Sequence, residues 1–181
     1  MEANDLLFDT ENEEIIKIIQ KAVVERANYD LRKIISIAQK LRLKSSTGKK
    51  DQYGDEIEDY SKVPTKDLIK LYEEAVSHAF FATPIRLRAF VESSLANIIY
   101  EDEYNKALLG ATGTQAIRQA EATIAIQNTE FKQIYRKMYA KYVEDVVKSF
   151  EQFVRRLERI IDLREKEEKL PFTTFEQSKS K

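Results

Sequence analysis

The stretch that decides the fold is TEFKQIYRKMYAKYVEDVVKSFEQFVRRLERIIDLREKEEK, residues 129–169. It contains no Gly or Pro, and the first Pro after it is Pro171. At 1.5 Å per residue it predicts one amphipathic α-helix roughly 60 Å long. Its apolar residues recur in steps of three or four, which keeps them on one helical face: Phe131, Tyr135, Met138, Tyr142, Val146, Phe150, Phe153, Leu157 and Ile161.

The composition of the 181-residue chain extends this prediction to the whole protein. Only four Gly and three Pro occur, which indicates few turns and long elements. The charged fraction of 34% is typical of long helices with solvated faces. We therefore predict an all-α fold in a single domain, 1–181. It would be an elongated helical bundle with two long antiparallel helices, about 10–44 and 129–169, and two or three medium helices between them.

The first long helix is predicted to begin at Thr10, because Thr10 and Glu13 have the spacing of a capping box. Residues 1–9 would then be an N-terminal arm. The segment 45–64 holds two Gly and ends in Pro, which predicts a flexible loop. At the other end of the chain, residues 170–181 are polar and are expected to form a disordered tail.

The intervening helices are predicted from their own start signals. Thr65 can cap a helix over about 66–82, with Leu68, Leu71, Tyr72, Ala75, Ala79 and Phe80 on its buried face. Pro84 tolerates a first helical position and disfavours an interior one, so a new helix should begin there. That helix would run to about Leu109 through Leu87, Val91, Leu95, Ile98 and Ile99. Gly110 and Gly113 end it, and a helix of about 14 residues follows.

Several function classes are disfavoured by what the sequence lacks. It has no Cys, which excludes disulfides, thiolate metal sites and cysteine nucleophiles and suits a reducing interior. No run of about 18 apolar residues occurs, so no membrane span is expected. Residues 1–14 hold six acids and no base, unlike a signal peptide. These features predict a cytoplasmic protein.

Enzymatic chemistry has little support in the sequence. His78 is the single histidine, and beside Ala79, Phe80 and Phe81 it is expected to be a half-buried structural residue. Residues 45–50, SSTGKK, lack the first Gly of a phosphate-binding loop and have Lys50 where that motif needs Ser or Thr. We therefore predict a protein that is not an enzyme, with no catalytic residues, no metal ligands and no cofactor.

The strongest functional signal is a block of positive charge. Residues 31–50 hold seven bases and no acid, and five acids follow within 51–60. A phosphate backbone gains from each such contact by counterion release, and Tyr53 could stack on a base of a single strand. The block could instead pair with the acids of 51–59, pair with the acidic N-terminus of another subunit, or remain a solvated face. The candidate nucleic-acid-binding residues are Arg32, Lys33, Lys40, Arg42, Lys44, Lys49, Lys50 and Tyr53.

The layout resembles that of the phage UvsY-type recombination mediators. The similarity covers the last third of the chain, where TQAIRQAEATIAIQ at 114–127 leads into the long helical pattern, and elsewhere it is an outline only. Residues 66–110 have no counterpart in that layout. The resemblance implies an all-helical, ring-forming protein that binds single-stranded DNA and helps to load a recombinase.

Two functions remain open at this point. The first is an oligomeric helical protein that binds single-stranded DNA or RNA, in the manner of a recombination accessory factor with a recombinase partner. The second is a structural or assembly protein of the virus or phage type, or an adaptor, which acts through coiled-coil-like contacts with copies of itself or with a structural protein. Both predict a homo-oligomer without membrane contact.

Overall fold

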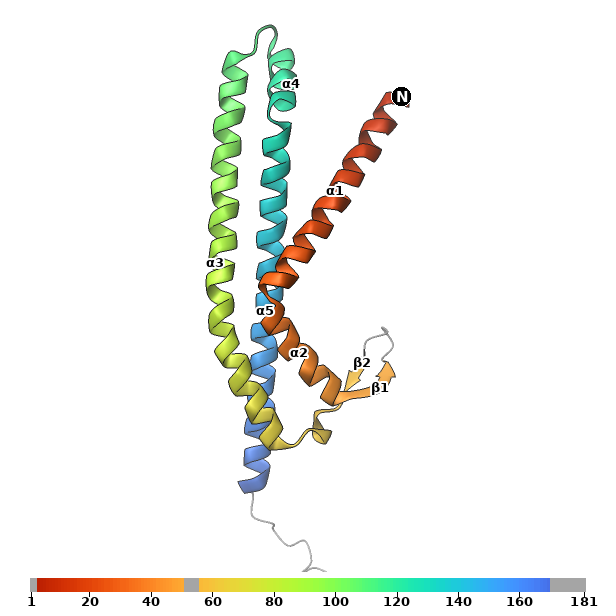
Figure 1. Cartoon of the computed structure of the whole chain (residues 1–181), viewed down its shortest axis with the longest axis vertical. Coiled ribbons are helices and arrows are strands. Elements are labelled where there is room, and N and C mark those ends of the chain that lie inside the picture. Colours follow the sequence, from red (N-terminus) through yellow and green to blue (C-terminus); the bar gives the residue numbers. More distant parts are fainter. Residues whose placement is uncertain (1–2, 51–55, 170–181) are drawn as a thin grey trace, which may run out of the picture. The chain divides into compact units, whose positions relative to one another are not determined.

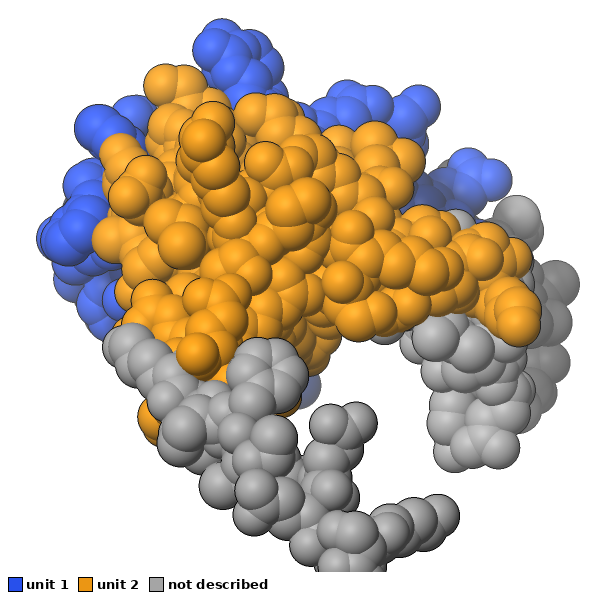
Figure 2. Space-filling view, turned by 90° about the horizontal axis from the view of Figure 1, so that it is seen from below, with its two compact units in different colours: residues 1–32, 80–148 blue, residues 33–79, 149–181 orange. Residues whose placement is uncertain are grey.

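The computed structural model describes residues 3–50 and 56–169. Within these ranges the chain forms two compact units, which we call unit 1 (residues 1–32 and 80–148) and unit 2 (residues 33–79 and 149–181) (Figure 2). Five helices account for most of the structure (Figure 1). They are α1 (Ala3–Asp30), α2 (Arg32–Ser45), α3 (Thr65–Gly110), α4 (Gln115–Ala125) and α5 (Gln127–Lys169).

The all-α class and the long C-terminal helix are confirmed. The predicted helix 10–44 is instead two helices, with Leu31 between them. Asp30 ends α1, where a negative charge opposes the helix dipole, and its carboxylate is held by Arg26 and Tyr139. Helix α1 also begins at Ala3, so most of the arm predicted for 1–9 is helical.

The segment predicted as a loop over 45–64 contains a small hairpin. Strands β1 (Ser46–Lys50) and β2 (Glu56–Glu58) pair antiparallel, and a 3-10 turn, η1 (Tyr60–Lys62), follows. Gly48 has a φ of 69°, which a side chain would disfavour, in a strand whose register shifts between Ser46 and Lys50. The tail predicted for 170–181 lies outside the described residues.

Helix α3 is continuous for 46 residues and contains Pro84, so the predicted break at this proline is wrong. Proline removes the hydrogen bond that the carbonyl of Phe80 would otherwise receive. Residues 80 and 84 are both exposed, so water can satisfy that carbonyl. Ala82 and Ala89 on the opposite side are buried, and their packing favours an uninterrupted helix.

In unit 1 the antiparallel partner of α5 is α3, rather than the helical stretch 10–44 (Figure 1). Glu92 contacts Arg136, Asn97 accepts a hydrogen bond of 3.0 Å from Gln133, and Glu103 accepts one from Thr129. The residue numbers rise along α3 while those of their partners fall along α5, so the two helices are antiparallel. Helix α4 lies between them in the chain and starts after Gly113, which has a φ of 109°.

Unit 2 has a leucine-rich core. Residues of α2, α3 and α5 meet in it together with Val63, and the buried members are Leu41, Val63, Leu68, Leu71, Leu157 and Ile161. Arg164 of α5 fastens the turn before α3, because its guanidinium donates to the carbonyls of Val63, at 2.6 Å, and Tyr60. The stripe predicted for residues 150–161 is confirmed here. In unit 1 the fully buried residues of α5 are Tyr139, Val143 and Val147, one position along from those predicted, because α5 contacts both α1 and α3.

Candidate functional site

Helix α3 in unit 1 buries its small residues and exposes its large ones. Ala82 and Ala89, seven residues apart, are 2% and 1% exposed. Phe80, Leu87 and Ile98 on the other side are 76%, 62% and 63% exposed. We call this side the outer face of α3 and define it by eight residues: Phe80, Phe81, Leu87, Phe90, Val91, Leu95, Ile98 and Ile99.

The outer face of α3 corrects a prediction from the sequence. The spacing of residues 66–82 predicts that Phe80 lies on the buried face of its helix, and this is wrong, because Phe80 is 76% exposed. The alanines pack inward because a small residue lets two helices approach closely, which leaves the bulky side chains outside. One signal was present in the sequence: the apolar residues of 80–99 cover more than a single stripe, which is typical of a helix with two partners. A contiguous apolar surface of this kind marks an interaction site.

A cluster of charged residues joins three helices of unit 1. The carboxylate of Glu92 on α3 contacts Arg26 of α1 at 3.3 Å, Arg88 at 2.9 Å and Arg136 of α5. The side chain of Glu92 is 21% exposed, so this is a partly buried site. We call Arg26, Arg88, Glu92 and Arg136 the Glu92 cluster. Three guanidinium groups share one carboxylate, and the result is local positive charge.

Tyr139 extends this polar contact toward α1. Its hydroxyl donates to the carboxylate of Asp30, and the guanidinium carbon of Arg26 lies 4.2 Å from the centre of its ring. Burial, followed by the hydrogen bond to Asp30, raises the pKa of Tyr139 to about 12. The phenol therefore keeps its proton at any physiological pH, and its role is to hold α1 against α5.

The raised pKa of Tyr139 predicts a loss of stability at high pH. The stabilisation is complete below the unfolded pKa of about 10 and disappears as the pH rises through the folded value of about 12. We expect Tyr139→Phe to be less stable than the wild type by about 2 kcal/mol at pH 8, and the difference to shrink above pH 10. Urea unfolding of both proteins from pH 8 to 12 measures this, and a difference that stays constant with pH would contradict it.

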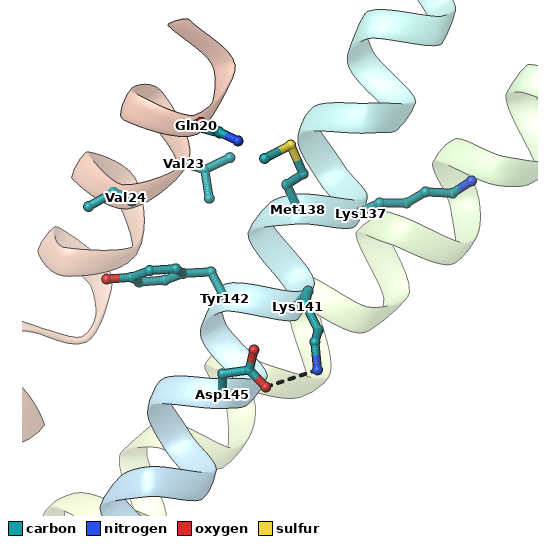
Figure 3. Close-up of a pocket in the computed structure, with 8 residues that line it drawn as sticks. All are labelled: Gln20, Val23, Val24, Lys137, Met138, Lys141, Tyr142 and Asp145. Carbon is teal, nitrogen blue, oxygen red and sulfur yellow. Dashed lines mark hydrogen bonds and ion pairs between the residues drawn. The ribbon is translucent and has the colours of Figure 1, made fainter. Parts of the chain in front are cut away.

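A shallow groove of about 440 Å³ lies between α1 and α5 in unit 1 (Figure 3). Val23, Val24, Met138 and Tyr142 form its apolar wall. Lys141 at its border forms an ion pair of 3.0 Å with Asp145. This groove provides apolar contact area and no arrangement of nucleophile and base.

The predicted basic residues of α2 are exposed, and two of them are paired within unit 2. Lys40 Nζ lies 2.9 Å from Glu74, and Lys44 Nζ lies 3.0 Å from Asp67, both acids of α3. Lys33 and Arg42 are also exposed. The structure thus brings Lys40 and Lys44 to acids in α3, while the side chains of residues 51–58 lie outside the described part of the chain. Exposed ion pairs of this kind contribute little and can be exchanged for a phosphate.

The other predicted binding residues, Arg32, Lys49, Lys50 and Tyr53, belong to different parts of the chain. The guanidinium of Arg32 lies 4.8 Å from the ring centre of Tyr29 in unit 1, and Lys49 is exposed on β1. The hairpin register pairs residue Lys50 with Glu56 across the two strands. Tyr53 lies outside the described residues.

Metal-binding and membrane-spanning features are absent from the described residues. No group of three or more His, Cys, Asp or Glu side chains in the described part of the chain could hold a metal ion. Among the helices of residues 3–50 and 56–169, none has a stretch both long and apolar enough to cross a membrane. His78 is half-buried on α3. Comparison with protein-family models, curated proteins and solved structures finds no match.

Proposed function

We propose that this protein is a non-enzymatic assembly or adaptor protein that associates with copies of itself. The observation that carries the proposal is the outer face of α3, where eight large apolar side chains are each at least 43% exposed. Exposing such an apolar surface to water is unfavourable, and burying it on association contributes a free energy of about 25 cal/mol for each Å². A helix face with anchors three, four and seven residues apart is suited to packing against another helix.

Binding of single-stranded nucleic acid is the second candidate function. It is favoured by the exposed cations Lys33, Lys40, Arg42 and Lys44 on α2 and Lys49 on β1. The pairing of Lys40 with Glu74 and of Lys44 with Asp67 weakens this candidate relative to the first. Self-association and strand binding are compatible, and the resemblance to recombination mediators implies both.

The self-association proposal predicts that the wild-type chain sediments as a dimer or larger species at 10–100 µM, on the order of the concentrations at which moderate interfaces form. Leu95→Glu should convert it to a monomer, because a charge on the outer face would have to be buried without a partner. Leu163→Glu is the matched control, since Leu163 is 59% exposed, Leu95 is 53% exposed, and Leu163 lies outside the outer face. Circular dichroism checks that all three proteins are equally helical.

Adding a single-stranded oligonucleotide to the same measurement, at low and at moderate salt, tests the second candidate. A nucleic-acid-binding protein gains the mass of the strand, and the gain falls as salt rises. Replacing Lys44, Lys49 and Lys50 by Glu should then weaken binding and flatten its salt dependence. A wild-type chain that is monomeric at 100 µM would overturn the self-association proposal, and unchanged mass at low salt would overturn the second candidate.

A further inference from the structure

We infer that the second copy binds to the outer face of α3 in the antiparallel direction, with Leu95 at the two-fold axis. The inference rests on the proposed self-association and adds its orientation and register. Leu95 lies at the middle of the C-terminal part of the outer face, with Val91 four residues before it and Ile99 four residues after it. In an antiparallel pair centred on Leu95, Val91 of one copy lies opposite Ile99 of the other.

The exposed area is sufficient for such a dimer. Phe80, Phe81 and Phe90 are each at least 64% exposed, and aromatic side chains can bury about 150–250 Å² apiece. In the register centred on Leu95, Phe81 lies opposite Leu109, which is 86% exposed. With the aliphatic residues, the exposed apolar area is on the order of 800 Å² per copy, which is the usual share of one partner in a stable interface. A symmetric contact between identical surfaces also closes the assembly at two copies through this face.

The charges at the two ends of the outer face select the antiparallel direction. At one end, Arg88 belongs to the Glu92 cluster, where three guanidinium groups share one carboxylate. At the other end, three successive acids, Glu101, Asp102 and Glu103, stand with Lys106, which forms an ion pair with Asp102. One end is thus rich in positive charge and the other in negative charge.

The spacing of these charges supplies the register. Arg88 is seven residues before Leu95 and Asp102 is seven residues after it, so both lie on the same side of the helix as Leu95. An antiparallel pair centred on Leu95 therefore places Arg88 of each copy next to Asp102 of the other. A parallel pair would bring Arg88 next to Arg88 and the acids next to acids, and like charges at an interface are repulsive.

Because the chain has no cysteine, single introduced cysteines can test the orientation directly. Leu95→Cys should form a disulfide between copies on mild oxidation, since residues facing each other at a two-fold axis are within disulfide distance. Arg88→Cys should not, because in the antiparallel pair the two residues 88 are about 21 Å apart along the helices. The double variant Arg88→Cys/Asp102→Cys should cross-link again.

Charge reversal is the second measurement. Arg88→Glu and Asp102→Lys should each weaken the dimer at least about tenfold, and the double variant should recover most of the loss. Cross-linking of Arg88→Cys as readily as Leu95→Cys would show a parallel dimer and overturn the inference while the proposed function stands. If the wild type is a dimer but neither Leu95→Cys nor Arg88→Cys cross-links, the register is overturned while the proposed function stands. A monomeric wild type would overturn both.

Discussion

Replacing Glu92 by Ala is expected to lower the free energy of unfolding by about 3 kcal/mol. Its carboxylate is the shared acceptor of Arg26, Arg88 and Arg136, and it is 21% exposed. Removing it leaves two partly buried guanidinium groups, Arg26 and Arg136, 29% and 37% exposed, with Asp30 beside Arg26 as the remaining carboxylate. Since those arginines come from α1 and α5, the loss affects the packing of α1, α3 and α5 in unit 1. Urea unfolding at one fixed protein concentration measures the change.

Arg88→Ala is the matched control for Glu92→Ala. Arg88 contacts the same carboxylate at 2.9 Å, but its side chain is 78% exposed. An ion pair in water contributes little, so we expect a change under about 0.5 kcal/mol. A loss of less than about 1 kcal/mol for Glu92→Ala would mean that water already solvates the arginines and that the cluster does not hold α1, α3 and α5 together.

Leu157→Ala is expected to cost about 3 kcal/mol through the loss of packing in unit 2. Leu157 is 1% exposed and contributes to the same core as Leu41, Leu68 and Leu71. Shortening it removes buried apolar surface and leaves a cavity, because the surrounding helices can close only in part. The midpoint of urea unfolding should fall accordingly.

Leu163→Ala provides the comparison within the same helix. Leu163 is six residues further along α5 and is 59% exposed, so the same chemical change removes little buried surface. We expect a change under about 0.5 kcal/mol. Equal losses for the two leucines would show that the residues around Leu157 rearrange to fill the space, or that Leu163 is covered in solution.

The two predictions describe different ways of stabilising the two units. In unit 1, the α3–α5 pair is held by the Glu92 cluster and by side-chain hydrogen bonds such as that between Gln133 and Asn97. In unit 2, leucines of three helices form a conventional core. The largest apolar side chains of α3 in unit 1 are exposed, and they are the surface for the association that we propose.

The basic segment of α2 shows how much of the candidate nucleic-acid-binding site could be predicted from the sequence. Charge segregation along the chain correctly located a run of exposed cations on α2. It also left open whether acids of the chain meet them. Glu74 and Asp67, more than twenty residues away, do so at 2.9 and 3.0 Å, and only the packing of α2 against α3 brings these residues together.

Helix α3 shows the same limit for the fold. Pro84 predicted a break, because proline in a helix interior is a reliable local signal. That signal does not include the burial of Ala82 and Ala89, which favours a continuous helix.

The sequence by itself determined that this protein is all-α, that its C-terminal helix is long, and that residues 31–50 carry seven bases and no acid. These properties follow from periodicity, the scarcity of Gly and Pro, and local composition, which act between residues near in the chain. Only the tertiary structure decided which face of α3 is buried, which helix is the antiparallel partner of α5, and which acids meet the cations. Those outcomes depend on how closely two helix surfaces can approach, and a helix whose apolar residues cover more than one face does not specify this locally.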